Sequence, residues 1–201
     1  MNRKNVITII MTLVLGMALT GQIFTQTKLG PRTESFFKTF SSGTYHMKTA
    51  TLAAGVNTEM ELFIKGDMVA TTMSSQGETV KTIIRDNKAY MIMEQMKMIM
   101  ITPSQGIAST GAINTAGISF TGSGTAVFAG KNLPYEEYAD NNSIKSQFFI
   151  DGNRLAGIRS ISSAAGTFDM VISVLDQNVP DSAFNIPSSG YMVQDMSNIK
   201  F

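Results

Sequence analysis

Apolar and polar positions alternate along much of the chain after residue 44, and this pattern predicts β-strands. Three segments share one design, in which an apolar-rich run is followed by a tight turn and a second such run. They are 59–72 with a turn at Gly66-Asp67, 80–93 with a turn at Asp86-Asn87, and 146–161 with a turn at Asp151-Gly152. Because Gly, Asp and Asn tolerate positive φ, each segment predicts an antiparallel hairpin, and successive hairpins build a meander.

Four further runs have strand character, which brings the count to roughly ten and is enough for a strongly curved sheet or barrel. They are 44–51, 126–129, 135–138 and 167–175. Before them, 32–40 carries Phe36, Phe37 and Phe40 at a spacing that fits one helical face. We therefore expect a mainly β fold with a short amino-terminal helix packed on the sheet.

The segment 91–101 reads Met-Ile-Met-Glu-Gln-Met-Lys-Met-Ile-Met-Ile and contains five methionines. With Glu94-Gln95 as a two-residue turn, Met93 opposes Met96, Met91 opposes Met98, and Ala89 opposes Met100. Alternation then puts all five methionines on one face. A thioether face adapts to irregular apolar ligands, whereas ordinary core packing and Cu(I) coordination are the alternative interpretations.

Residues 102–125 interrupt the pattern, because Gly, Ser, Thr and Ala dominate there with Ile107, Ile113, Ile118 and Phe120 interspersed. We expect no strand in this stretch. Small residues with occasional large apolar ones suit a lid that lies over a ligand cavity, and an unstructured loop is the alternative.

The first 26 residues form a leader with Arg3 and Lys4 at its start and an uncharged run over 6–24. This fits a secretory signal peptide, and the run is also long enough to remain as a membrane anchor. Residues 27–34, with Gly30-Pro31, are predicted to be a linker, and 35–201 a single domain. We therefore expect an extracytoplasmic protein, either secreted or held at the outer surface of the cytoplasmic membrane.

Composition removes several chemistries. The formal net charge is +1 with 15% charged residues, so no nucleic-acid partner is expected. Cysteine is absent, which excludes disulfides, cysteine catalysis and Cys-ligated zinc. The only histidine, His46, lies in a predicted strand and is expected to be structural, while Glu136 and Glu137 would face opposite sides of theirs. We expect no enzyme, cofactor or metal site.

The order of several short motifs resembles the LolA-like bacterial lipoprotein-carrier superfamily, in particular its uncharacterised exported relatives. The motifs are Leu62-Phe63-Ile64-Lys65-Gly66-Asp67, Ile83-Ile84-Arg85-Asp86-Asn87-Lys88-Ala89-Tyr90 followed by Lys97, Gly130-Lys131 with Tyr135-Glu136-Glu137-Tyr138, Phe148-Phe149-Ile150-Asp151-Gly152-Asn153-Arg154-Leu155-Ala156-Gly157-Ile158, and Val179-Pro180-Asp181-Ser182-Ala183-Phe184-Asn185-Ile186-Pro187. They span about residues 36–191. The resemblance implies an unclosed antiparallel half-barrel whose concave face, partly covered by a helix or loop, holds acyl chains.

Two departures from the family pattern matter. Many relatives carry an arginine soon after the first turn, where this chain has Met68-Val69-Ala70, so a latch built on that arginine is not carried over. Leu19-Thr20-Gly21 resembles the start of a lipobox, but Gln22 stands where the lipid-bearing cysteine is required. Lipidation is therefore not expected.

Together these features predict an exported, non-enzymatic and monomeric carrier or binding protein for a lipid or other hydrophobic ligand. The predicted ligand-contacting residues are Met91, Met93, Met96, Met98, Met100, Phe36, Phe40, Ile113 and Phe120. The first alternative is a cell-envelope sensor or interaction module on the same fold without a ligand. The second alternative is a methionine-rich Cu(I)-binding protein.

Overall fold

The computed structural model of the chain describes residues 29–53, 56–104, 118–140, 144–162 and 166–196. A single α-helix, α2 (Glu34–Ser41), precedes the strands in this part of the chain, and a 3₁₀ turn, η1 (Asp181–Phe184), lies near its end. The strands are β1 (Thr44–Ala53), β2 (Val56–Lys65), β3 (Met68–Ser75), β4 (Glu78–Arg85), β5 (Lys88–Met93), β6 (Met98–Pro103), β7 (Ser119–Phe128), β8 (Lys131–Ala139), β9 (Lys145–Asp151), β10 (Arg154–Ser162), β11 (Gly166–Asp176) and β12 (Met192–Asp195). None of the described helices has both the length and the apolar character needed to cross a membrane.

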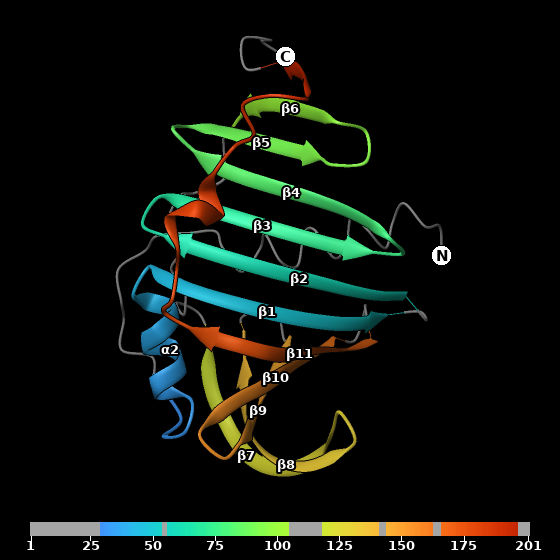
Figure 1. Cartoon of the computed structure of the whole chain (residues 1–201). Coiled ribbons are helices and arrows are strands. Elements are labelled where there is room, and N and C mark those ends of the chain that lie inside the picture. Colours follow the sequence, from blue (N-terminus) through green and yellow to red (C-terminus); the bar gives the residue numbers. More distant parts are fainter. Residues whose placement is uncertain (1–28, 54–55, 105–117, 141–143, 163–165, 197–201) are drawn as a thin grey trace.

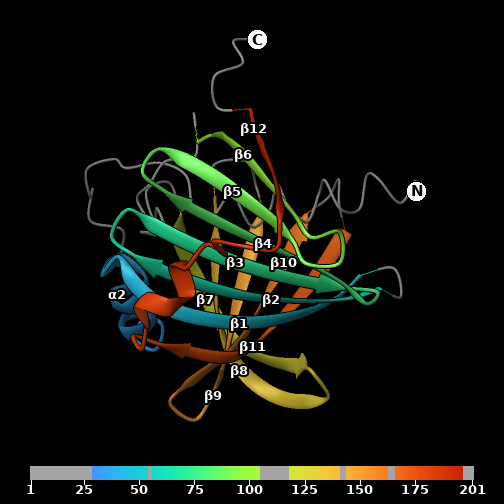
Figure 2. The same cartoon turned by 45° about the horizontal axis from the view of Figure 1, so that its top comes forward.

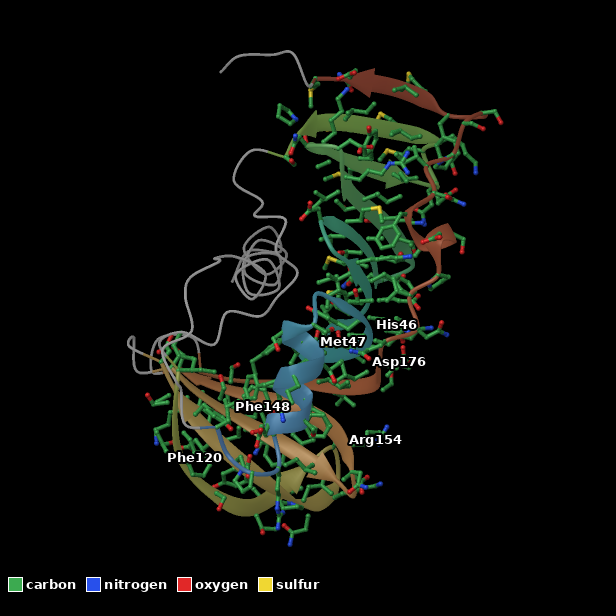
Figure 3. The ribbon with its side chains drawn as sticks, turned by 90° about the vertical axis from the view of Figure 1, so that its left-hand side faces the viewer. His46, Met47, Phe120, Phe148, Arg154 and Asp176 are labelled. Atoms are coloured by element: carbon green, nitrogen blue, oxygen red, sulfur yellow. The ribbon has the colours of Figure 1, made fainter. Side chains whose placement is uncertain are left out.

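All twelve strands form one sheet in the order β12-β6-β5-β4-β3-β2-β1-β11-β10-β9-β8-β7. Neighbouring strands are antiparallel except β12 and β6, which are parallel. The sheet begins at β12 and ends at β7 without closing, and it curves around α2 (Figures 1 and 3). The predicted fold class, a mainly β curved sheet that remains unclosed, is therefore confirmed. We call the concave face that carries α2 the inner face, and the opposite face the outer face.

The predicted hairpin turns are confirmed in two of three places. Lys65 opposes Met68 across Gly66-Asp67, and Arg85 opposes Lys88 across Asp86-Asn87. At the second turn Asp86 and Asn87 have φ of 53° and 59°, the positive values that such two-residue turns require. The third turn is shifted by one residue, because Asp151 opposes Arg154 and the turn residues are Gly152 and Asn153.

The expectation that 102–125 lacks strand structure is wrong at both ends. Strand β6 continues to Pro103, and β7 begins at Ser119. At Gly124 of β7 a side chain would not fit, since a Cβ there would come within 2.7 Å of the Tyr135 hydroxyl on β8. Residues 105–117, including Ile113, lie outside the described residues, and the lid remains a prediction there.

The end of the predicted linker is packed against the sheet. Glu136, on the inner face of β8 and 2% exposed, accepts hydrogen bonds from the backbone N–H groups of Arg32 (3.0 Å) and Thr33 (2.9 Å) and from the Thr33 hydroxyl (2.7 Å). The Tyr138 hydroxyl accepts a bond from the Gly30 N–H at 2.8 Å. These bonds satisfy amides of the residues that lead into α2, so the predicted helix is present and its start is fixed to β8.

Apolar side chains gather on both faces of the sheet. On the inner face, α2 buries Phe37 and Phe40 in a cluster with residues of β1, β2 and β8–β11. On the outer face, the segment after β11 passes over β3–β6 (Figures 1 and 2). Phe184 of η1, in this segment, packs against side chains of these strands. The outer cluster contains Ala70, Ile83, Ile92, Ile99 and Phe184. The β3–β6 half of the sheet is thus covered on its outer face by the chain's own carboxyl-terminal segment.

Candidate functional site

The methionine-rich strands pair as a hairpin, but not in the predicted register. Met93 opposes Met98 and Met91 opposes Met100, so the turn has four residues instead of two. The predicted pairings were therefore wrong by two residues on β6. Since side chains alternate with a period of two, Met91, Met93, Met98 and Met100 still share one face. Met96 does not, because it lies in the turn with 61% of its surface exposed.

The pairing of neighbouring strands identifies that face as the inner one. From Met91 the register runs through Thr82, Thr71 and Leu62 to Met47 of β1. Met47 belongs to the inner cluster that contains the α2 phenylalanines. The four strand methionines are therefore on the concave side of the sheet, and their side chains are half-buried.

A row of apolar residues crosses the inner face, and the sequence alone did not predict this row as a whole. Paired residues from β2 to β6 and β12 form it, and five of the six are methionines: Met60, Met73, Val80, Met93, Met98 and Met192. We call Met91, Met93, Met98 and Met100 together with Met73 and Val80 the methionine wall. Part of the signal was present in the sequence, because the predicted turns at Gly66-Asp67 and Asp86-Asn87 imply that Met60 opposes Met73 and that Val80 opposes Met93.

The aromatic residues of the predicted site lie elsewhere on the inner face. Phe40 is fully buried and contacts the Tyr45 ring edge-on at 5.4 Å, whereas Phe36 is partly buried against the same cluster. Phe120 of β7 contacts the Tyr138 ring at 5.7 Å. Figure 3 shows Phe120 in the lower part of the sheet, below Met47. The predicted residues thus divide into a methionine wall on β3–β6 and an aromatic group beside α2.

Tyr138, which accepts the hydrogen bond from Gly30, is buried on the inner face of β8. Burial raises the pKa of the Tyr138 hydroxyl, which stays protonated and close to the Thr33 hydroxyl at ordinary pH.

Glu137, next to Glu136 in the sequence, points to the outer face, where Gln147 donates to its carboxylate at 2.9 Å and Lys145 lies at 3.2 Å. The prediction that the two adjacent glutamates face opposite sides is confirmed.

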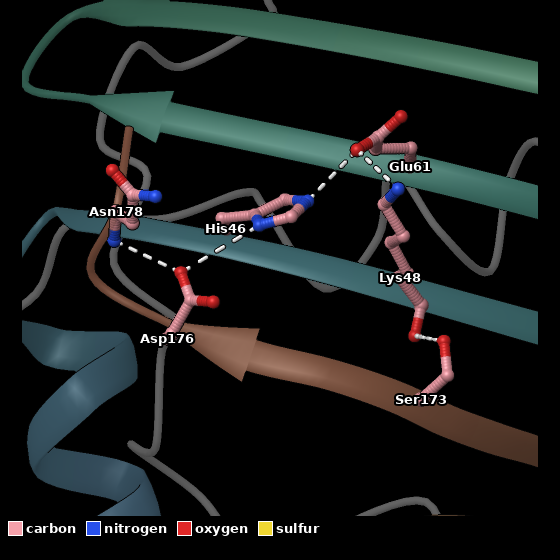
Figure 4. Close-up of polar contacts among 6 residues, drawn as sticks. All are labelled: His46, Lys48, Glu61, Ser173, Asp176 and Asn178. Atoms are coloured by element: carbon pink, nitrogen blue, oxygen red, sulfur yellow. Dashed lines mark hydrogen bonds and ion pairs between the residues drawn. The ribbon is translucent and has the colours of Figure 1, made fainter. Parts of the chain in front are cut away.

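His46 lies on the outer face in a polar cluster at the β1–β2–β11 junction (Figure 4). Its Nε2 is 2.9 Å from Glu61, its Nδ1 is 3.5 Å from Asp176, and its ring stacks on Phe63 at 4.3 Å. Burial acts to raise the pKa of Glu61, but hydrogen bonds from Lys48 and His46 hold it below its ordinary value. Both imidazole nitrogens are directed at carboxylates and neither at a hydroxyl nucleophile, an arrangement typical of a structural histidine.

Metal coordination by conventional ligands finds no support in the described ranges. Within them, no group of three or more His, Cys, Asp or Glu side chains could hold a metal ion.

Comparisons with known proteins identify similar folds. No protein-family model and no curated protein sequence matches the chain. Among solved structures, an uncharacterised conserved protein from Thermus thermophilus is similar with a TM-score of 0.51 and 8% identity, over 79% of this chain and 93% of that one. A LolA superfamily protein from Nitrosomonas europaea matches with a TM-score of 0.38 and 10% identity, over 78% of this chain and 99% of that one. At such low identity the Thermus likeness shows the fold alone.

Proposed function

We propose that this protein binds a lipid or another hydrophobic ligand on its methionine wall and acts as a non-enzymatic carrier or binding protein. The observation that carries the proposal is the register of β3–β6, which puts six neighbouring thioether and aliphatic side chains on the concave face. Unbranched methionines adapt to irregular apolar shapes, as a surface for acyl chains requires.

The two faces of these strands differ in what covers them. On the outer face, Ile83, Ile92 and Ile99 are buried beneath Phe184. On the inner face, α2 packs against β1 and the β8–β11 half, where Phe37 contacts Tyr138 and Phe148. The methionines opposite that outer core remain half-buried. This asymmetry supports the wall as the ligand surface.

The free energy gained by moving an acyl chain from water to this apolar surface is sufficient for binding, even without polar groups in the site. Each methylene moved from water to an apolar surface contributes about 0.8 kcal/mol, so burying roughly ten methylenes offsets the cost of association. The predicted leader would export the domain and bring it to the outer surface of a membrane, where acyl chains are available. An exported lipid-binding role is consistent with both features.

The test compares lipid retained by three purified proteins. We expect native mass spectrometry and lipid extraction to detect a bound lipid in the unmodified chain. Combining Met91→Gln with Met100→Gln puts two opposed amides on the wall, and we expect roughly a tenfold loss of retained lipid, since about 1.4 kcal/mol corresponds to a factor of ten.

Met68→Gln is the matched control, because Met68 is a half-buried methionine that packs on the outer face. It should retain the lipid. A chain without bound lipid, or an equal loss in both variants, would contradict the proposal.

A further inference from the structure

One corner of the sheet exposes an unusual amount of apolar surface. Four large apolar side chains in the described part of the chain are more than half exposed. Three of them lie at this corner: Met96 at 61% in the β5–β6 turn, and, on β12, Met192 at 66% on the inner face and Val193 at 57% on the outer face. The Met192 N–H donates to the Lys97 carbonyl at 2.8 Å, which brings β12 to this turn. We call Met96, Met192 and Val193 the methionine corner.

Side-chain contacts fix the turn that presents this corner. The Tyr191 hydroxyl donates to the Glu94 carboxylate, and Lys97 lies 5.1 Å from the Tyr191 ring centre and 3.3 Å from Glu94. Gln95 donates to the Gly77 carbonyl at 2.7 Å. The turn that carries the exposed Met96 is therefore held in a defined place at the edge of the sheet.

The corner is continuous with the methionine wall. Met192 pairs with Met98, which pairs with Met93, and all three lie on the inner face. The row thus runs without a polar interruption from the concave surface to the exposed edge strand. An acyl chain that follows this row would reach the wall without crossing open water.

We propose that the methionine corner docks on a lipid bilayer and is the point at which the ligand enters. Three side chains fall far short of the roughly 20–30 residues that each partner contributes to a stable protein interface, which disfavours a second copy of the chain as the occupant. A bilayer needs no complementary shape. This proposal rests on the proposed lipid-binding function.

The residues around the corner suit a membrane interface. Tyr191 and Lys97 each combine an apolar body with a polar end, a combination favoured at the headgroup level of membranes. Two charges of the β5–β6 turn are paired with each other, Glu94 with Lys97 at 3.3 Å. Paired charges lower the electrostatic cost of approaching the interface.

The absence of cysteine from the chain allows a site-specific test. Met96→Cys, Val193→Cys and Val127→Cys are made singly in the full chain and labelled with the fluorophore NBD. Val127 is the matched control, since it is 63% exposed on β7, at the opposite edge of the sheet. Each labelled protein is mixed with vesicles of phosphatidylethanolamine and phosphatidylglycerol, with and without nitroxide groups on the acyl chains.

We expect nitroxide lipids to reduce NBD emission about twofold or more at positions 96 and 193, because the fluorophore there enters the apolar layer, and to leave position 127 little changed. The control also accounts for any tethering of the whole chain by its leader, which would affect all three positions. Quenching at 96 and 193 no greater than at 127 would overturn the proposal, as would a change at 96 that depends on protein concentration without vesicles.

The same preparations distinguish this inference from the proposed function. If lipid is bound but quenching is not selective for positions 96 and 193, the proposal that the methionine corner docks on a bilayer is wrong, while the proposed ligand-binding wall is unaffected. Selective quenching in a protein that holds no lipid would contradict the lipid-binding wall while supporting the corner as a membrane contact.

Discussion

Glu136 shows how one buried carboxylate connects distant parts of this chain. Its oxygens accept hydrogen bonds from the backbone N–H groups of Arg32 and Thr33, more than one hundred positions earlier. Negative charge at a helix start is favourable because unpaired amides and the helix dipole converge there. A carboxylate of β8 thus holds the residues that lead into α2.

Glu136→Gln is expected to destabilise the protein by about 1–3 kcal/mol, because an amide replaces one acceptor oxygen with a donor that faces buried N–H groups. Urea unfolding measures this change, and hydrogen exchange should show faster exchange in α2. Glu59→Gln, at an exposed position of β2, is the control and should change stability by less than about 0.5 kcal/mol. Equal effects of the two substitutions would contradict the anchoring role.

The lowered pKa of Glu137 predicts that the stability of the fold depends on pH. Its hydrogen bond from Gln147, assisted by Lys145 and Thr121, holds its pKa below the ordinary range. A carboxyl whose folded pKa is lowered stabilises the fold above its unfolded pKa, and this contribution is lost as the pH falls through the folded pKa. We expect urea midpoints to fall below about pH 4.3, the ordinary glutamate pKa, and to fall less steeply in Glu137→Gln. Parallel curves for the two proteins would refute the assignment.

Local elements were the part of the fold most accessible from sequence. The turns at Gly66-Asp67 and Asp86-Asn87 can be recognised in the sequence, because few residue types accept the positive φ that such turns require. The turn after Met93 was harder, since Glu94-Gln95 and the observed four-residue turn both keep the methionines on one face. Lys97, at φ 48°, carries the positive φ in that turn and gives no compositional signal.

Elements that depend on distant contacts were not predictable in the same way. Strand β12 reads Met-Val-Gln-Asp, too short for a periodic pattern, and it pairs with a strand more than ninety positions earlier. The start of β7 was hidden because Gly, Ser and Thr dominate it and have little intrinsic strand signal, whereas its pairing with β8 appears only in the fold. The attachment of residues 30–33 to the sheet could not be predicted either, because their hydrogen-bond partners Glu136 and Tyr138 lie on β8, more than one hundred positions later.

The carboxyl-terminal segment is expected to act as a structural strap on the outer face. Phe184, 2% exposed, packs with Ile83, Ile92 and Ile99, so Phe184→Ala should cost about 3–5 kcal/mol through lost burial and an unfilled cavity. Asp181→Ala removes only the exposed ion pair to Lys65 in the same segment and should cost less than about 1 kcal/mol. Thermal unfolding of the two variants checks the contrast, and a comparable loss from both would argue against a packed strap.

The described part of the chain forms a single curved sheet with different coverings on its two faces. The strap covers β3–β6 from outside, and α2 fills the part of the inner face beside β1 and β8–β11. The methionine wall occupies the other part of the inner face. The half-barrel and four of the wall methionines were predictable from the sequence, but the predicted site also included aromatic residues that pack in the core around α2.

Photo-crosslinking with a fatty acid that carries a diazirine on its acyl chain tests the ligand wall most directly. After irradiation of the full chain and digestion, mass spectrometry locates the modified residues. We expect adducts on the β5 and β6 peptides that contain Met91, Met93, Met98 and Met100, and their loss when an excess of unlabelled fatty acid competes. Two results would contradict the account. One is a set of adducts without preference for the wall, for example with Met68 on the outer face modified equally. The other is a set of adducts that competition does not reduce.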